Sequence, residues 1–252
     1  HRDLHLCLRR QRQMCIRDSF GGGQAQEMET NARDIIEAIR TARNDARIKG
    51  IVLDLSKLAG SSLSLYEEIG QELQKFKETK KPIYAFGESY SQSQYFLAAH
   101  ADKIYVDADA QSFPGGVFLH GFASYPLYLK DALDKLSLTM HIFKAGIFKD
   151  AAETLTRQSM SDYSREANQL LVDNLWQHYL TRVAEQRGIT TQTISNYIAN
   201  YSEIIYPLDA DIVDASIKIG LIDKQLTRTA WQKEMQELAG KSGENYYQID
   251  FR

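Results

Sequence analysis

The feature that most constrains the fold of this chain is an alternation of short apolar runs with longer segments of helical periodicity. Apolar residues recur at helical spacing in several segments, as Leu65, Ile69, Leu73 and Phe76 do. Between such segments lie short apolar runs that are typical of buried strands. The predicted strands are 51–55, 82–87, 103–107 and 117–119, and the predicted helices include 27–47, the segment around Leu65, and 92–101. Strands that alternate with helices predict an α/β domain whose strands are mostly parallel.

Helices dominate the pattern towards the C-terminus. Pro126 suits the first turn of a helix that runs to Leu136, and residues 138–144 are predicted to form a strand. A further helix is expected to begin near Lys149, and a long helix is predicted over 161–187, with a core stripe of Leu170, Leu171, Leu175, Tyr179 and Val183. Later elements are predicted at 191–200, 208–219 and 226–239 (helices) and 245–250 (strand). We expect residues 20–252 to form one domain whose helical C-terminal portion embraces a neighbour.

The first 19 residues differ abruptly from the rest of the chain. They contain five Arg and two Asp but no Lys or Glu, a net charge of +3, whereas the remaining residues carry −6. The string MCIRDS at 14–19 is similar to a translated sequencing-adapter end. We therefore predict that residues 1–19 are a non-native leader, and a basic targeting or nucleic-acid-binding arm is the alternative. Cys7 and Cys15 both fall in this leader, so thiol catalysis is not expected.

Composition argues against several classes of function. The 252 residues carry a net charge of −3 and are 43% hydrophobic, so no basic face points to nucleic acid. No apolar run approaches the ~18 residues of a membrane-spanning helix. The glycines at 21–23 precede a helix but follow no strand, so they lack the context of a nucleotide-binding loop. The six histidines are scattered, and neither a metal nor a cofactor is expected.

A serine-rich loop at 89–93 raises the possibility of a catalytic triad with His100 or His141 and Asp102. The structural alternative is that Ser91 is a helix N-cap, whose hydroxyl accepts a hydrogen bond from a free backbone N–H group. A histidine on a strand, as predicted for His141, is more often a core or rim residue. On the residues alone we prefer the N-cap interpretation.

Lys149 is a second candidate, because it follows a glycine-containing loop and has apolar neighbours. Burial and the positive end of a helix favour a neutral lysine amine, which is a base. The alternative is a solvent-exposed ladder of Lys149, Glu153 and Arg157 at i, i+4 spacing. The residues alone favour the ladder.

Seven stretches, in unbroken order, carry a resemblance to a known family. They are 50–55 (GIVLDL), 81–85 (KPIYA), 90–98 (YSQSQYFLA), 101–104 (ADKI), 120–123 (HGFA), 146–153 (GIFKDAAE) and 176–180 (WQHYL). Together they resemble the N-terminal half of the long, tandem-domain members of the bacterial signal peptide peptidase A (protease IV) family. The resemblance spans residues 27–250 and implies an α/β fold like that of crotonases and Clp proteases, a superhelix of repeated β-β-α units.

The resemblance also implies a serine protease that uses a Ser–Lys dyad. Its Gly-x-x-Lys-x-Ala segment matches 146–151 and assigns the catalytic general base to Lys149. The chain has a degenerate copy of the family's Ser-Gly-Gly-Tyr-Tyr motif at 92–96, with Gln92 in place of the nucleophile. Ser91 and Ser93 are each one residue, or about 100° on a helix, out of register. We therefore expect the serine to come from a C-terminal domain outside these residues, and the chain alone to be inactive.

Substrates, partners and location follow from the same resemblance. It implies degradation of remnant signal peptides after protein export, by a tetramer anchored on the periplasmic face of the inner membrane. Asp150 departs from the small residue or Ser usual after the lysine. Its carboxylate either favours the charged amine of Lys149 or caps the following helix. The run 153–155 reads Glu-Thr-Leu where the family has Glu-Pro-Phe, so the local turn is expected to differ.

Two other functions remain open at this point. One is a crotonase-like acyl-CoA enzyme, with backbone N–H groups near Gly60 and Gly115 holding a thioester oxyanion, although no acidic pair stands out. The other is a scaffold domain that shapes an oligomer without catalysis. Both the helical C-terminal portion and the degenerate serine motif allow the scaffold.

Overall fold

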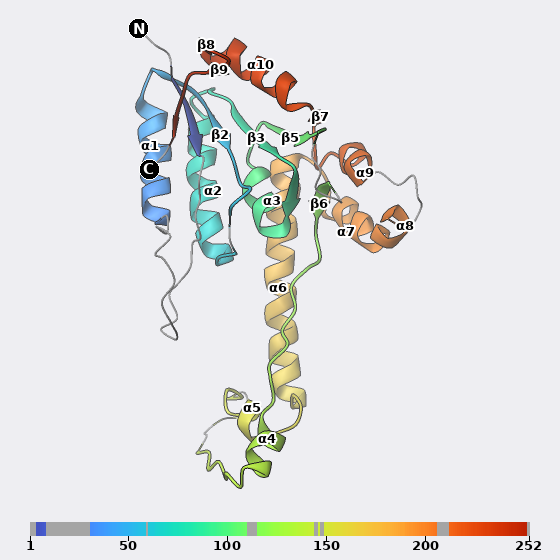
Figure 1. Ribbon diagram of the computed structural model, residues 1–252. Coiled ribbons are helices and arrows are strands. Elements are labelled where there is room, and N and C mark those ends of the chain that lie inside the picture. Colours follow the sequence, from blue (N-terminus) through green and yellow to red (C-terminus); the bar gives the residue numbers. More distant parts are fainter. Residues whose placement is uncertain are drawn as a thin grey trace. The chain divides into compact units, whose positions relative to one another are not determined.

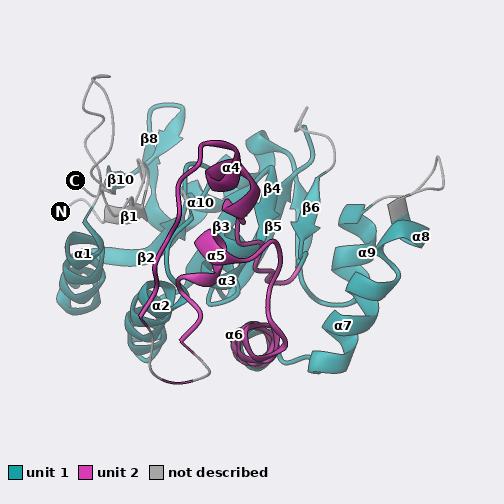
Figure 2. Ribbon diagram, turned by 90° about the horizontal axis from the view of Figure 1, so that it is seen from below, with its two compact units in different colours: residues 1–120, 182–252 teal, residues 121–181 magenta. Residues whose placement is uncertain are grey.

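The computed structural model describes residues 31–58, 60–109, 115–143, 146, 149–205 and 212–250, together with the backbone of 4–8. Most of the predicted leader, the glycines at 21–23, the start of two predicted helices (27–30 and 208–211) and residue 144 lie outside these ranges. The chain forms two compact units, which Figure 2 shows in teal and magenta. Unit 1 comprises residues 1–120 and 182–252, and unit 2 comprises residues 121–181.

Unit 1 is built on a parallel six-stranded sheet with the order β10-β1-β2-β3-β5-β7 (Figure 1). These strands are β1 (Leu4–Leu8), β2 (Ile48–Leu53), β3 (Ile83–Gly87), β5 (Lys103–Asp107), β7 (Lys224–Leu226) and β10 (Gln248–Asp250). A separate parallel pair joins β4 (Ser89–Ser91) to β6 (Gly116–Phe118), and β8 (Lys241–Ser242) pairs antiparallel with β9 (Asn245–Tyr246). Parallel strands require crossover connections, which the helices supply.

The helices of unit 1 follow the strands in a repeated order. They are α1 (Ala32–Asn44), α2 (Leu63–Lys77), α3 (Gln92–Ala98), α7 (Thr191–Ala199), α8 (Tyr201–Ile205), α9 (Ile212–Lys218) and α10 (Arg228–Ala239). A strand of the large sheet, a short strand of the second sheet and a helix follow one another as β3, β4 and α3. The next two strands, β5 and β6, divide between the two sheets in the same way. This order confirms the predicted α/β class with β-β-α units.

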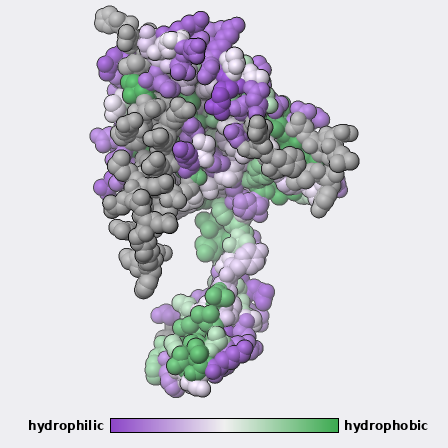
Figure 3. Space-filling model, viewed as in Figure 1, coloured by the Kyte–Doolittle hydropathy of each residue, from purple (hydrophilic) through white to green (hydrophobic). Residues whose placement is uncertain are grey.

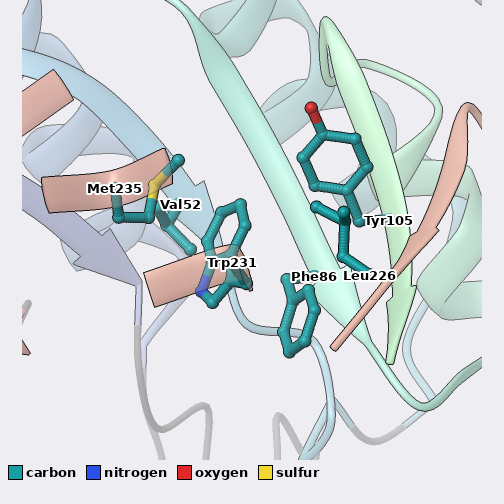
Figure 4. Packing of buried hydrophobic residues seen from close by; sticks show 6 residues of the cluster. All are labelled: Val52, Phe86, Tyr105, Leu226, Trp231 and Met235. Atoms are coloured by element: carbon teal, nitrogen blue, oxygen red, sulfur yellow. The ribbon is translucent and has the colours of Figure 1, made fainter. Parts of the chain in front are cut away.

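The core of unit 1 lies between the sheet and its helices. Val52, Phe86 and Tyr105 point from three strands towards Trp231 and Met235 of α10 (Figure 4). The Phe86 and Trp231 rings stack, with centroids 5.0 Å apart. Because successive strand side chains face opposite sides of a sheet, the neighbouring residues Ile51, Leu53, Ile83 and Ala85 bury the other face. This two-sided burial explains why these strands read as continuous apolar runs.

Unit 2 contains α4 (Lys130–Lys135), α5 (Glu153–Thr156) and most of α6 (Asp162–Arg187), the long helix that continues into unit 1. An irregular segment, 121–129, runs beside α6 in both ribbon views (Figures 1 and 2). Phe122 fixes it there, since its ring meets those of Trp176 and Tyr179 edge-on at 6.0 and 6.2 Å between centroids. Ser124 also donates a hydrogen bond to Asn168 Oδ1 at 3.1 Å.

Three predictions for unit 2 are wrong. Pro126 does not open a helix, because α4 begins only at Lys130. Residues 138–143 form no strand, and no helix begins near Lys149, because α5 starts at Glu153. The long helix itself is confirmed, but only part of its expected core stripe is. Tyr179 and Val183 are buried, whereas three predicted core leucines are exposed: Leu170, Leu171 and Leu175.

Candidate active site

Residues 92–96, which were compared above with the family's serine motif, lie at the start of α3 in unit 1. Gln92 is buried, and its side-chain oxygen accepts a hydrogen bond from the backbone N–H of His120 at 3.1 Å. Ser91 caps the helix, and it forms a capping box with Gln94 in which each side chain bonds the other's backbone. Ser93 hydrogen-bonds the Tyr66 side chain, whose pKa is raised by burial and lowered in part by that bond. The four polar side chains at 91–94 therefore all have structural roles.

The structure does not assemble the triad considered from the sequence. His100 is buried and its Nδ1 donates to the carbonyl of Phe96 at 3.0 Å, while burial lowers the pKa of its ring. Asp102 Oδ2 accepts from the backbone N–H of Ile83 at 2.8 Å, and its other oxygen pairs with Lys77 at 3.2 Å. His141 is an exposed residue of unit 2. The N-cap interpretation of Ser91 is confirmed.

Lys149 lies in unit 2, on the short connection that leads into α5. Its side chain is exposed, and it makes no ion pair with any residue in the described ranges. The predicted ladder is wrong, because Glu153 is buried and hydrogen-bonds Ser161, while the Arg157 guanidinium donates to the carbonyl of Ser159. Lys149 is therefore left without the partners that the ladder would have given it.

Asp150 does not cap α5 with its side chain. The N-cap residue of α5 is Ala152, and no side chain caps that position. Asp150 contributes its backbone carbonyl instead, which accepts a hydrogen bond from the N–H of Glu153 at 2.8 Å. The connection thus closes into a turn between Asp150 and Glu153, immediately after Lys149.

A groove of about 440 Å³ runs between the irregular segment 121–125 and α6, within unit 2. Its wall combines aromatic, aliphatic and polar side chains: Phe122, Tyr125, Met160, Val172, Trp176, Ser124, Arg165, Asn168, Gln169 and Asp173. The backbone of 122–128 takes no part in helix or strand pairing. The groove could not be predicted from the sequence, because its lining comes from an irregular segment and one face of α6.

Unit 2 exposes a large set of apolar side chains, which Figure 3 shows as a concentration of green. Among the described residues, all but Ile249 of the exposed large hydrophobic side chains belong to this unit. We call them the apolar surface of unit 2: Tyr125, Leu127, Leu129, Leu136, Leu138, Met140, Ile142, Phe143, Tyr163, Leu170, Leu171 and Leu175. Phe143, six residues before Lys149, is 97% exposed. Large exposed apolar side chains gathered in one unit are typical of interaction sites.

None of the helices in the described ranges combines the length and the apolar character needed to cross a bilayer. Within the same ranges, no group of three or more His, Cys, Asp or Glu side chains is placed to hold a metal ion.

Comparison with known proteins places these observations in a family. The family model described as "Peptidase family S49" matches residues 75–242. Protease 4 of Salmonella typhi is 37% identical over 227 residues, and Protease 4 of Haemophilus influenzae is 34% identical over 211 residues. These matches cover 86% and 84% of this chain, but the chain spans only about a third of the length of either relative (36% and 34%).

A solved structure, an enoyl-CoA hydratase/isomerase family protein from Silicibacter pomeroyi, is similar at 14% identity with a TM-score of 0.38. That match covers 83% of this chain and 69% of the other. A likeness at this level adds nothing to the topology described above. The residues that the family model matches include both Gln92 and Lys149. This chain belongs to peptidase family S49.

Proposed function

We propose that the chain is the lysine-bearing part of a serine peptidase with a Ser–Lys dyad, and that Lys149 is its general base. The observation that carries this proposal is the contrast between two positions of the family motifs. Gln92, at the place of a nucleophile, is buried and hydrogen-bonded to the backbone of His120. Lys149 is exposed just before a turn, with no ion pair in the described part of the chain. The nucleophilic serine would then come from a domain outside these 252 residues.

The proposed chemistry follows from the two groups. The neutral amine of Lys149 takes the proton from the serine hydroxyl as the oxygen attacks the peptide carbonyl carbon. Backbone N–H groups stabilise the negative charge that develops on the carbonyl oxygen. The protonated lysine then gives its proton to the leaving amine, and the resulting acyl-enzyme is hydrolysed by water that the same lysine deprotonates.

A base of this kind requires a dry environment, because desolvation favours the neutral amine. The apolar surface of unit 2 supports the view that a partner provides it. Met140, Ile142 and Phe143 precede Lys149 closely in the chain and are all exposed. A partner that covers these side chains would also exclude water from the turn that follows them. We propose that the serine-bearing domain, or another copy of this chain, is that partner.

The proposed substrates are remnant signal peptides, cleaved after export on the periplasmic face of the bacterial inner membrane by a homo-oligomer. The groove between 121–125 and α6 supports a peptide substrate. It offers apolar side chains together with the backbone of an irregular segment outside helix and strand. Backbone at the edge of a groove is a feature that peptide-binding sites use.

The test is the Lys149→Ala variant in the full-length peptidase that contains this chain. Loss of a general base should lower kcat for a signal-peptide-derived substrate by ~10²–10⁴-fold. Lys135→Ala is the matched control, because Lys135 is an exposed lysine at the end of α4 in the same unit. It should leave kcat unchanged. The 252-residue chain alone should not react with a fluorophosphonate, which labels activated serines. Near-normal activity of Lys149→Ala in a correctly assembled enzyme would exclude the dyad.

A non-catalytic scaffold is the second candidate, and the apolar surface of unit 2 is the observation in its favour. It makes the opposite prediction for the same experiment. Under the scaffold hypothesis, Lys149→Ala leaves activity intact, while substitutions in the apolar surface abolish assembly and activity together.

A further inference from the structure

Glu153 is a buried charged residue within unit 2, only 6% exposed. Its carboxylate accepts two hydrogen bonds from one residue, Ser161. The backbone N–H of Ser161 donates to Oε2 at 3.0 Å, and the hydroxyl donates to Oε1 at 2.7 Å. Bonds to a carboxylate are charge-assisted and stronger than those between neutral groups. A buried carboxylate is retained only where such partners compensate for its lost hydration.

Ser161 immediately precedes α6 and lies at its N-cap position. Its hydroxyl oxygen accepts from the N–H of Ser164 at 3.2 Å, and its carbonyl accepts from the N–H of Arg165 at 2.9 Å. In a capping box, an acid three residues into the helix bonds the N-cap backbone N–H. Here Glu153 makes that bond from a separate element, eight residues earlier. The positive end of the α6 dipole also favours its charge.

The Glu153–Ser161 contact holds the turn that follows Lys149. The N–H of Glu153 donates to the carbonyl of Asp150 at 2.8 Å, so the residue next to Lys149 is hydrogen-bonded to the residue that contacts α6. A second tie comes from the preceding segment, where the N–H of Leu129 donates to the carbonyl of Thr154 at 2.7 Å. The one-turn helix α5 is too short to be stable without such contacts.

We propose that Glu153 is a positioning residue that fixes the backbone of Lys149 relative to the start of α6. The inference rests on the proposed role of Lys149, and it explains how an exposed lysine on an irregular connection keeps a defined position. General-base catalysis needs that precision, because the amine must lie within hydrogen-bond reach of the serine hydroxyl.

The test measures position directly, in the 252-residue chain. Spin labels are attached at Lys149→Cys and at Gln169→Cys, an exposed site on α6, in a background in which Cys7 and Cys15 are replaced by Ser. Pulsed electron paramagnetic resonance then gives the distribution of distances between the two labels. Glu153→Ala should broaden this distribution, and Glu153→Gln should broaden it less, because one amide oxygen can still accept from Ser161. Glu166→Gln, an exposed acid in the first turns of α6, is the control and should change nothing.

A second measurement covers the case in which Glu153→Ala unfolds unit 2. Ser161→Ala removes the hydroxyl, and with it the bonds to Glu153 and to the N–H of Ser164, but it leaves the bond from the Ser161 backbone N–H to the carboxylate. The Ser161 amide itself should then exchange more slowly than in Glu153→Gln. In Glu153→Gln the Ser161 amide should exchange ~10-fold or more faster than in the parent chain, as expected when a charge-assisted bond is lost.

An unchanged distance distribution in Glu153→Gln, together with a lower unfolding midpoint, would reduce Glu153 to a stabilising residue and overturn the proposal. A broadened distribution supports it whatever the chemistry of Lys149. If the distribution broadens but Lys149→Ala leaves the full-length peptidase active, the positioning role stands and the proposed function fails. The two failures are thus distinguishable.

Discussion

Gly70 lies in the middle of α2, where the ring of His100 packs against it. A Cβ atom at this position would lie 2.5 Å from His100 Nε2, closer than such atoms approach one another. Gly→Ala within a helix normally stabilises a protein by about 1 kcal/mol. Here we expect Gly70→Ala to lower the free energy of unfolding by about 1–3 kcal/mol, because the buried ring has to move. Urea unfolding of the double variant with His100→Ala is the control, since there the alanine should no longer be harmful. A stable Gly70→Ala single variant would contradict the packing described.

Glu72, on the same helix, should make the free energy of unfolding depend on pH. Hydrogen bonds from Arg40 and from Lys75, each 2.9 Å long, lower the pKa of this buried carboxyl from its ordinary 4.5 to about 2. A carboxyl whose pKa is lower in the folded state stabilises that state above the unfolded pKa, and the contribution is lost as pH falls through the folded one. Glu72→Gln should therefore be less stable than the parent by about 1–2 kcal/mol at pH 7.

The difference in free energy of unfolding between the parent and Glu72→Gln should narrow as pH falls from 4.5 to about 2, because the Glu72 carboxyl of the parent becomes protonated in this range. Urea unfolding across this pH range measures it. Glu68→Gln, at an exposed position of the same helix, should show no such dependence. If the parent and Glu72→Gln differed in stability by the same amount at every pH, Glu72 would contribute through its packing rather than through its charge.

Single residues also show what the sequence could reveal about the site. Lys149 is proposed as a site residue from a motif of fixed spacing, which can be recognised in the sequence whatever the local conformation is, and its role stays a prediction. The contact between Glu153 and Ser161 was not predicted, and the i, i+4 spacing of Lys149 and Glu153 suggested the wrong partner. Helical spacing indicates a contact only where a helix exists, and α5 begins after Lys149.

At the scale of elements, Phe122 is the side chain that ties the irregular segment 121–129 to α6. Its ring contacts both Trp176 and Tyr179, which stack on each other at 5.2 Å. Phe122→Ala should destabilise unit 2 by about 1–3 kcal/mol and speed amide exchange in 121–129. Phe143→Ala is the matched control, because that ring is 97% exposed and its loss should have little effect. Equal effects of the two substitutions would argue against the aromatic contact as the tie.

The burial of each helix and strand explains which of them could be predicted from the sequence. The strand at 103–107 and the helix around Leu73 were predicted correctly, because both faces of the sheet are buried and the pattern is strong. The strand at 138–144 was wrong. Four of its residues are apolar (Leu138, Met140, Ile142 and Phe143), but all four are exposed, so apolar residues in this segment do not indicate a buried strand. Leu170 and Leu171 were predicted to be core residues for the same reason, but both are exposed. Apolar residues at helical spacing show that a helix has an apolar face, but not whether other residues of the same chain bury that face. The three-residue strand β7 carries too little pattern to be recognised.

At the scale of the whole molecule, the assignment of residues 1–19 as a non-native leader stays a prediction. Residues 1–19 were set apart from the fold on composition, yet β1 (Leu4–Leu8) pairs in parallel with both β2 and β10. The pairing makes the backbone of this segment part of the sheet. A strand of alternating apolar residues, such as Leu4, Leu6 and Leu8, suits that place whatever its origin, because backbone hydrogen bonding is independent of sequence.

The distribution of apolar surface over the whole chain predicts its behaviour in solution. Nearly all large exposed hydrophobic side chains of the described residues belong to unit 2, and a net charge of −3 provides little repulsion between copies. We therefore expect the isolated chain to self-associate through unit 2, with sedimentation velocity showing species that grow with concentration. Leu171→Glu with Leu175→Glu should weaken this association by ~10²-fold or more, since each buried leucine contributes about 1.5–3 kcal/mol. The free energy of unfolding should change by less than about 0.5 kcal/mol, because both side chains are exposed in the single chain.

The control adds the same two charges to the same helix without removing an apolar group. Gln169→Glu with Gln177→Glu fulfils this, as both glutamines are exposed on α6. If the control disperses the chain as well as the leucine variant does, net charge governs the association and the apolar surface does not. If only the leucine variant becomes monomeric, these leucines are interface residues. The same double substitution in the full-length peptidase should then lower activity, because the partner that covers α6 is also the one proposed to enclose Lys149.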